Sequence, residues 1–113
     1  MADINQVVLV GRVVRDAELR YANSGTPILT FSLAINRRRR QGDQWTDEAN
    51  FFDVEYIRSG AEKVHQYVTK GKQIGVQGEL RQDRWEKEGQ TRTKVKVHAV
   101  NLQLLGGSGG GAG

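Results

Sequence analysis

The sequence predicts an all-β domain: a five-stranded barrel with one short helix between its third and fourth strands, and with extended hairpins. Three observations support this fold class. Apolar and polar residues alternate with the period of strands, a single segment has helical spacing, and turn-forming residues separate the runs. We expect this domain to span residues 1–105 and a flexible Gly-rich linker to begin at residues 106–113.

The first strand is predicted at Val7 to Val14, which is apolar on both faces. Such a strand is typically covered on two sides. Because the chain has only 113 residues, a second subunit is a candidate for the second cover, with Val8 and Val10 as contacts. Residues 15–27 are rich in turn formers and are interpreted as a turn region.

The second and third strands are predicted at residues 28–36 and 50–59. In the third strand, alternation assigns Phe52, Val54 and Tyr56 to the core. The opposite face of that strand carries Phe51, Asp53, Glu55 and Ile57. The segment between the two strands is interpreted as a long hairpin loop, and loops of that length tend to be functional or disordered.

The helix is predicted at residues 59–71, where Ser59 and Glu62 form a capping-box pattern and Gly71 suits a left-handed stop. The last two strands are predicted as one hairpin over residues 72–105, with its turn at Glu88-Gly89 and a bulge near Ala99. This element order is that of an OB-fold barrel. Its sharp bends are expected at Gly11, Gly75 and Gly78.

Composition excludes several classes of protein. There is no cysteine, so disulfides, thiolate nucleophiles and cysteine zinc sites are absent, which fits a reducing compartment. No apolar stretch approaches the ~18 residues of a membrane span, and the start "MADINQVVLVGR" lacks the basic region of a signal peptide. The net charge is +4, with nine basic and five acidic residues in 59–113, which favours an anionic partner.

Nothing in the sequence indicates an enzyme. The two histidines, His65 and His98, have no second ligand at metal spacing. No nucleophile elbow and no glycine-rich phosphate loop is present. We therefore expect no catalytic residues, no metal and no cofactor.

The run from Arg37 to Arg40, followed by Trp45 and several acids, allows three interpretations. A nuclear signal favours a flexible segment and fits poorly inside a domain. A solvated loop, balanced by its acids, is the second interpretation. The third is one wall of a groove for a charged polymer, which requires aromatic surfaces nearby.

Such aromatic surfaces are predicted. Phe51 faces away from the core, and a base-stacking role and an oligomer contact explain it equally well. Trp85 lies four residues after Arg81 and is therefore expected on the same face of the strand, opposite the core. It stands among basic residues, which favours stacking. Aromatic platforms need bases that are splayed out of a duplex, so the pattern indicates a single-stranded nucleic acid bound with little regard to sequence.

The sequence resembles the bacterial single-stranded-DNA-binding protein family. The matching segments are "NQVVLVGRVVRDAELRY", "TFSLAIN", "FFDV", "YVTKGKQIGVQGELRQDRW" and "LQLLGG", which follow in order from residue 5 to 107. The resemblance implies an OB fold, usually a homotetramer, with single-stranded DNA wrapped over its outer faces. It implies roles in DNA replication, recombination and repair in the bacterial cytoplasm, associated with the nucleoid. It also implies a tail whose acidic tip recruits replication and repair proteins, and this sequence stops inside the Gly-rich linker before such a tip.

By matched position, the resemblance implies stacking by Phe51 and Trp85. Two further stacking positions fall at Arg39, whose guanidinium can stack on a base, and at Ile57, which offers only apolar contact. The complete set expected to bind DNA is Arg37, Arg38, Arg39, Arg40, Trp45, Phe51, Ile57, Lys70, Lys72, Arg81, Arg84 and Trp85. Asp53 and Glu55 share the face of Phe51 and should repel phosphate unless arginines neutralise them.

Two other functions remain open at this point. An RNA-binding or cold-shock-like OB module is disfavoured because the aromatic residues are few and lie on distant strands. A β-barrel adaptor that binds an acidic protein would use Phe51 and Trp85 as protein anchors.

Overall fold

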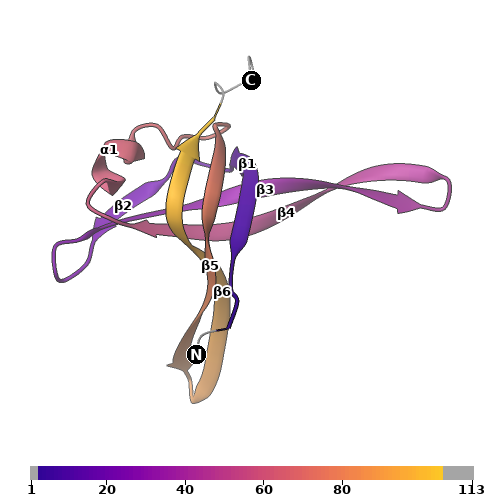
Figure 1. The fold of residues 1–113 in the computed structure, drawn as a ribbon. Helices are drawn as coiled ribbons and strands as arrows, with labels where there is room; N and C mark the ends of the chain where they lie inside the picture. Colours follow the sequence, from indigo (N-terminus) through magenta and orange to yellow (C-terminus); the bar gives the residue numbers. More distant parts are fainter. Residues whose placement is uncertain (1–2, 106–113) are drawn as a thin grey trace.

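The computed structural model describes residues 3–105, which form six strands and one short helix (Figure 1). The elements are β1 Val7–Val13, β2 Glu18–Tyr21, β3 Pro27–Gln41, β4 Gln44–Ile57, α1 Ala61–His65, β5 Gln73–Lys87 and β6 Gln90–Leu104. The expected linker at residues 106–113 lies outside the described residues.

Five of the strands close into a barrel. They follow the order β1-β5-β6-β4-β3, and β1 closes the ring by pairing Arg12 and Val13 with Ala34 and Leu33 of β3. Of the strand pairs within residues 3–105, β4 and β6 alone run parallel. With α1 between the third and fourth barrel strands, this arrangement confirms the predicted fold class.

The sixth strand, β2, corrects the prediction of a turn region at residues 15–27. It pairs with β3 alone, at the edge of the sheet. The turn itself is limited to a few residues, where the Ala22 amide donates to the Thr26 carbonyl at 2.9 Å. Because β2 has four residues, most of them exposed, it shows no strong apolar alternation that would reveal it.

The core fills the barrel from alternate positions of β3, β4, β5 and β6, together with Val13 of β1, Ala61 of α1 and Val68 of the segment after α1. Its largest fully buried side chains are Leu29, Leu33, Ile74, Val54, Val68, Val76 and Val97. The predicted bulge is confirmed, since the β5–β6 register jumps from Gln77↔Asn101 to Gly78↔Ala99. A Cβ at Gly78 or Gly11 would collide with backbone, whereas one at Gly75 would find ordinary contacts, so the close approach of neighbouring strands requires glycine at positions 11 and 78 but not at 75.

The helix is shorter than predicted. It covers Ala61–His65, is preceded by Gly60 as its N-cap, and has no side-chain cap hydrogen bond. The expected capping box is therefore wrong: Glu62 accepts a hydrogen bond from the Tyr21 hydroxyl at 2.9 Å instead. Gly71 does adopt a positive φ of 88°, but in the turn before β5 rather than at the helix end.

Two hairpins extend beyond the barrel as arms, which point in different directions (Figure 1). The first arm, residues 36–50, continues β3 and β4 to a tight turn at Gly42. The segment predicted as a long loop is thus a paired ribbon. The second arm, residues 81–95, continues β5 and β6 to the predicted turn at Glu88-Gly89, where both residues have positive φ.

The bases of the arms correct one core assignment. Phe52, predicted in the core, is 39% exposed. It lies where the first arm leaves the barrel, so the core covers only part of its ring, whereas Val54 two residues along is buried. Within residues 3–105, no helix has the length and apolar character needed to cross a membrane.

Candidate nucleic-acid interface

The first arm places one set of predicted residues on a single face. Residues directly opposite each other in an antiparallel pair share a face, and the register pairs Ala34 with Phe51 and Arg40 with Trp45. Alternation along the strands adds Arg38 to that face. We call the side of the strands opposite the core the outer face, and Phe51 on it is 64% exposed.

At the tip of the first arm, two arginines hold the indole of Trp45. The guanidinium carbons of Arg38 and Arg40 lie 5.3 Å and 5.8 Å from the ring centroid. These distances allow cation–π attraction. Trp45 remains 56% exposed, so the cluster presents an aromatic surface between two positive charges.

The arginine run is split between the two faces of the arm. Arg37 and Arg39 alternate with Arg38 and Arg40 and therefore point to the other side. There the guanidinium of Arg39 lies 3.4 Å from the carboxylate of Glu48. Arg39, at an implied stacking position, does not share the face of Phe51.

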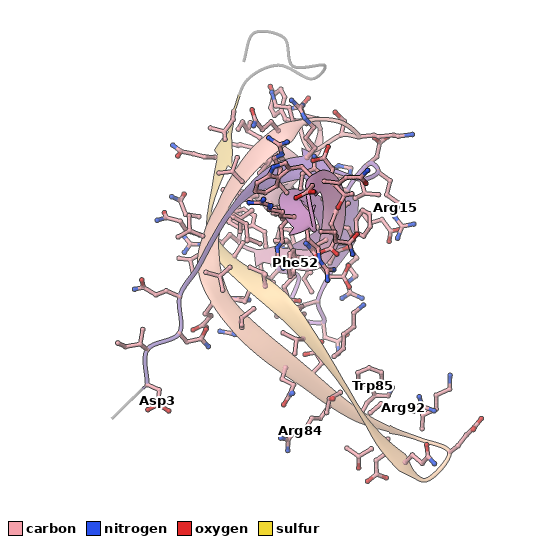
Figure 2. The ribbon with its side chains drawn as sticks, turned by 90° about the vertical axis from the view of Figure 1, so that its right-hand side faces the viewer. Asp3, Arg15, Phe52, Arg84, Trp85 and Arg92 are labelled. Carbon is pink, nitrogen blue, oxygen red and sulfur yellow. The ribbon has the colours of Figure 1, made fainter. Side chains whose placement is uncertain are left out.

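The second arm divides its predicted residues in the same way. The register pairs Trp85 with Arg92 and Arg81 with Lys96, which gives these four residues a common face. Figure 2 shows Trp85 and Arg92 on one side of the ribbon and Arg84 on the other. Arg81 is held by Glu79, with its Nη2 atom 2.9 Å from the carboxylate.

The remaining predicted residues lie on the barrel rather than on the arms. Lys70 and Lys72 belong to the turn between α1 and β5, where the Lys70 amide donates to Asp16 at 2.9 Å. The Lys72 carbonyl accepts from the Val13 amide at 3.0 Å. Ile57 ends β4 and pairs with Ile28, at the opposite end of that strand from Trp45.

A groove of about 300 Å³ lies on the outer face between residues 15–20 and the base of the second arm, over the barrel parts of β3 and β4, and none of the twelve predicted residues lines it. Its charged lining consists of four basic and five acidic side chains. In Figure 2, Arg15 of this lining lies on the same side of the second arm as Trp85. Asp53 and Asp83 of the lining share the faces of Phe51 and Trp85, two residues along β4 and β5, so the groove adjoins the surfaces that carry these two aromatic residues.

Two lysines of β6 neutralise the carboxylates on the groove floor. Lys94 Nζ lies 2.6 Å from Asp53, which also accepts from the Ser32 hydroxyl at 2.7 Å. Lys96 Nζ lies 2.8 Å from Glu55 and 2.7 Å from Asp83. Asp53 and Glu55 are thus paired with lysines, and not with arginines as the sequence pattern suggested.

These contacts shift two pKa values. Hydrogen bonds from Lys94 and Ser32 hold the pKa of Asp53 below its ordinary 3.8. Burial alone would lower the pKa of Lys96, but the hydrogen bonds with Asp83 and Glu55 outweigh it and raise the pKa above 10.5. Both groups are therefore charged at neutral pH.

Sequence reasoning missed Lys94 and Lys96. Their signal was the alternation of Lys94, Lys96 and His98 with Val95, Val97 and Ala99, which places the basic residues outward. Among the described residues, no group of three or more potential ligands is arranged to hold a metal ion.

Comparison with known proteins supplies the family. Residues 4–105 match the single-strand binding protein family, which is most of the chain.

The chain belongs to the single-strand binding protein family.

Two curated relatives of this family member are named single-stranded DNA-binding protein. The one from Treponema pallidum is 57% identical over 112 residues, covering 99% of this chain and 64% of the relative. The one from Borreliella burgdorferi is 43% identical over 107 residues, covering 93% of this chain and 72% of the relative. The chain thus spans less than two thirds of the Treponema pallidum protein.

A solved structure shares the fold of this family member. It is described as "Plasmodium falciparum SSB complex with ssDNA", and it matches with a TM-score of 0.85 at 22% identity. The match covers 94% of this chain and 98% of the other. The predicted family and the predicted OB-type barrel are both confirmed.

Proposed function

We propose that this protein binds and protects single-stranded DNA with little regard to sequence, and that it acts without catalysis. One observation carries the proposal: Phe51 and Trp85 point outward, 64% and 45% exposed, and each lies two residues along its strand from a residue that lines a charged groove, Asp53 and Asp83 respectively. Membership of the single-strand binding protein family supports the same function.

The physical reason lies in what exposed aromatic residues can bind. A flat ring on a protein surface can stack on a base only when the base is out of a duplex. Each stacked base contributes about 1–3 kcal/mol, and every base has such a face, so binding tolerates any sequence. Cations beside the rings then hold the phosphate backbone.

The predicted site residues fall into two groups in this proposal. The outer-face group stacks bases or holds the adjacent backbone: Arg38, Arg40, Trp45, Phe51, Arg81 and Trp85. The second group continues the path of DNA over the opposite faces of the arms and over the barrel: Arg37, Arg39, Ile57, Lys70, Lys72 and Arg84.

We also propose that the protein assembles as a homo-oligomer, with a tetramer as the expected form. Residues Val7–Gly11 of β1 pair with β5 on one side, and the described structure gives them no partner strand on the other. Val8 and Val10 on this strand are 66% and 51% exposed. An apolar strand with a free edge is a template for pairing with a second copy, and light scattering after size-exclusion chromatography measures the assembly.

The setting that we propose is DNA replication, recombination and repair in a bacterial cytoplasm, associated with the nucleoid. Recruitment of replication and repair proteins through an acidic tail tip stays a prediction, because it concerns residues beyond those described.

The test is tryptophan fluorescence against oligo-dT, with duplex DNA of equal phosphate content as the control, at low and high salt. We expect strong quenching by oligo-dT alone, reduced in Trp85→Ala and in Phe51→Ala. An equal response to both nucleic acids would indicate a general polyanion surface. No response to either, with a response to an acidic protein, would support an adaptor.

A further inference from the structure

The groove on the outer face contains cations that the proposed function leaves unused. Lys94 lines it and contacts both sides: its ammonium is paired with Asp53, which follows Phe51 by two residues on β4, and it lies opposite Asp83, which precedes Trp85 by two residues on β5. A strand of DNA that stacks on both aromatic residues must cross this floor.

The floor as it stands is a poor surface for phosphate. Its lining carries four basic and five acidic side chains, so it has no excess of positive charge. The Lys94 ammonium is occupied by Asp53 at 2.6 Å, a distance at which the carboxylate takes the place that a phosphate oxygen would occupy.

The two lysines of the floor differ in how easily they can change partners. In the Lys94–Asp53 pair the side chains are 58% and 44% exposed. In the Lys96–Glu55 pair they are 20% and 9% exposed, and Glu55 is also 3.4 Å from His98. Ion pairs between exposed side chains contribute little to stability, whereas breaking a buried pair leaves a charge without water or partner.

We propose that Lys94 is a phosphate-binding residue masked by Asp53, and that single-stranded DNA displaces the Asp53 carboxylate from it on binding. The Lys96–Glu55 pair stays closed throughout and keeps β4 and β6 together under the groove. This inference rests on the proposed function, because it specifies how one cation of that binding surface meets the backbone.

If Lys94 exchanges Asp53 for phosphate, removing the charge of Asp53 should raise the affinity for DNA rather than lower it. In the bound state Asp53 has lost its lysine and faces a phosphate, so the carboxylate opposes binding. Asp53→Asn removes that charge while its amide oxygen can still accept from Ser32. We therefore expect Asp53→Asn to bind oligo-dT more tightly than wild type, by about fivefold from a unit charge a few ångströms from a phosphate.

The matched control is Glu86→Gln. Glu86 lies on the second arm one residue from Trp85, on the opposite face, and outside the groove lining. Its substitution changes the net charge by the same amount as Asp53→Asn, so it measures the general effect of removing one acid. We expect a smaller gain in affinity than for Asp53→Asn.

Lys94→Gln completes the experiment. Its log–log salt slope should be shallower than wild type by about 0.7, the value expected when a protein neutralises one phosphate fewer on a single strand. In the Lys94→Gln background, Asp53→Asn should bring a smaller gain than in the wild-type background, because it then relieves only the repulsion between Asp53 and phosphate and no longer frees a lysine. Thermal unfolding of each variant checks that the fold is retained.

Two results would overturn the inference. One is weaker binding by a folded Asp53→Asn variant, which would mean that the pair positions the arm and stays closed. The other is an unchanged salt slope in Lys94→Gln. Both are read relative to wild-type binding of oligo-dT, so a failure of the exchange is distinct from a failure of single-stranded DNA binding itself.

Discussion

Lys96 of β6 and Glu55 of β4 form an ion pair in which the ammonium and a carboxylate oxygen lie 2.8 Å apart. Glu55 is only 7% exposed, although the pair lines a groove on the protein surface. The two residues are neighbours because β4 and β6 form the parallel contact of the barrel. Lys96 also binds Asp83 of the second arm, so one ammonium group connects the barrel to that arm.

Lys96→Met is expected to destabilise the protein. Glu55 would keep only its contact with His98, and a buried carboxylate without its cation costs about 2 kcal/mol of unfolding free energy. Urea denaturation measures the loss. Lys94→Met, which breaks the exposed pair instead, should cost under about 1 kcal/mol, and equal losses for the two variants would contradict the distinction.

Asp53 should make stability depend on acid pH. Its pKa in the folded state lies below the ordinary 3.8, mainly because of Lys94. Its contribution is therefore complete above the unfolded pKa and is lost as the pH falls through the folded value. We expect the difference in stability between wild type and Asp53→Asn to shrink below pH 3.8, as followed by denaturation at several pH values; a constant difference would argue against this origin.

Gly78→Ala should disrupt the barrel. An added Cβ would meet the carbonyl of His98 and the Cα of Ala99, which are backbone atoms of β6 at the bulge and cannot move independently. We expect a loss of about 3 kcal/mol or more, measured by thermal unfolding. Gly75→Ala on the same strand is the control, since its new methyl group would lie 3.6 Å or more from its neighbours; a similar loss there would mean that strand bending, not collision, is decisive.

The two faces of the first arm should differ in DNA binding. The double variant Arg38→Ala/Arg40→Ala removes the cations beside Trp45, and we expect its affinity for oligo-dT to fall about tenfold. Arg37→Ala/Arg39→Ala removes the same charge from the other face, where Arg39 is paired with Glu48. Its effect should be smaller, because an arginine already paired with a carboxylate offers less charge to a phosphate. Equal losses at one salt concentration would show that only total charge matters.

The barrel could be predicted because each of its strands buries one face in the core and leaves the other more exposed. Leu29, Phe31 and Leu33 alternate with polar neighbours, and all three are buried. The first arm could not be predicted in that way: both of its faces meet water, so its residues carry no alternation to distinguish strand from loop. The second arm was recognised because the Glu88-Gly89 turn marks its tip.

The candidate site was only partly accessible to sequence reasoning for a related reason. The outward positions of Phe51 and Trp85 follow from the alternation of side chains between the two faces of a single strand. The partners of Asp53 and Glu55 follow from pairing between β4 and β6, residues about forty positions apart in the chain, and no local pattern reports which distant strands become neighbours.

The division of Arg37 to Arg40 between two faces has a consequence for how this hairpin can change over evolutionary time. Inserting or deleting a single residue between the barrel and the tip would turn every later side chain to the reverse side. After such an insertion in β3, Arg38 and Arg40 would point away from the face that carries Trp45. Viable length variants of this hairpin are therefore expected to gain or lose residues two at a time in each strand, and the arm can be shortened or lengthened by design only in those steps.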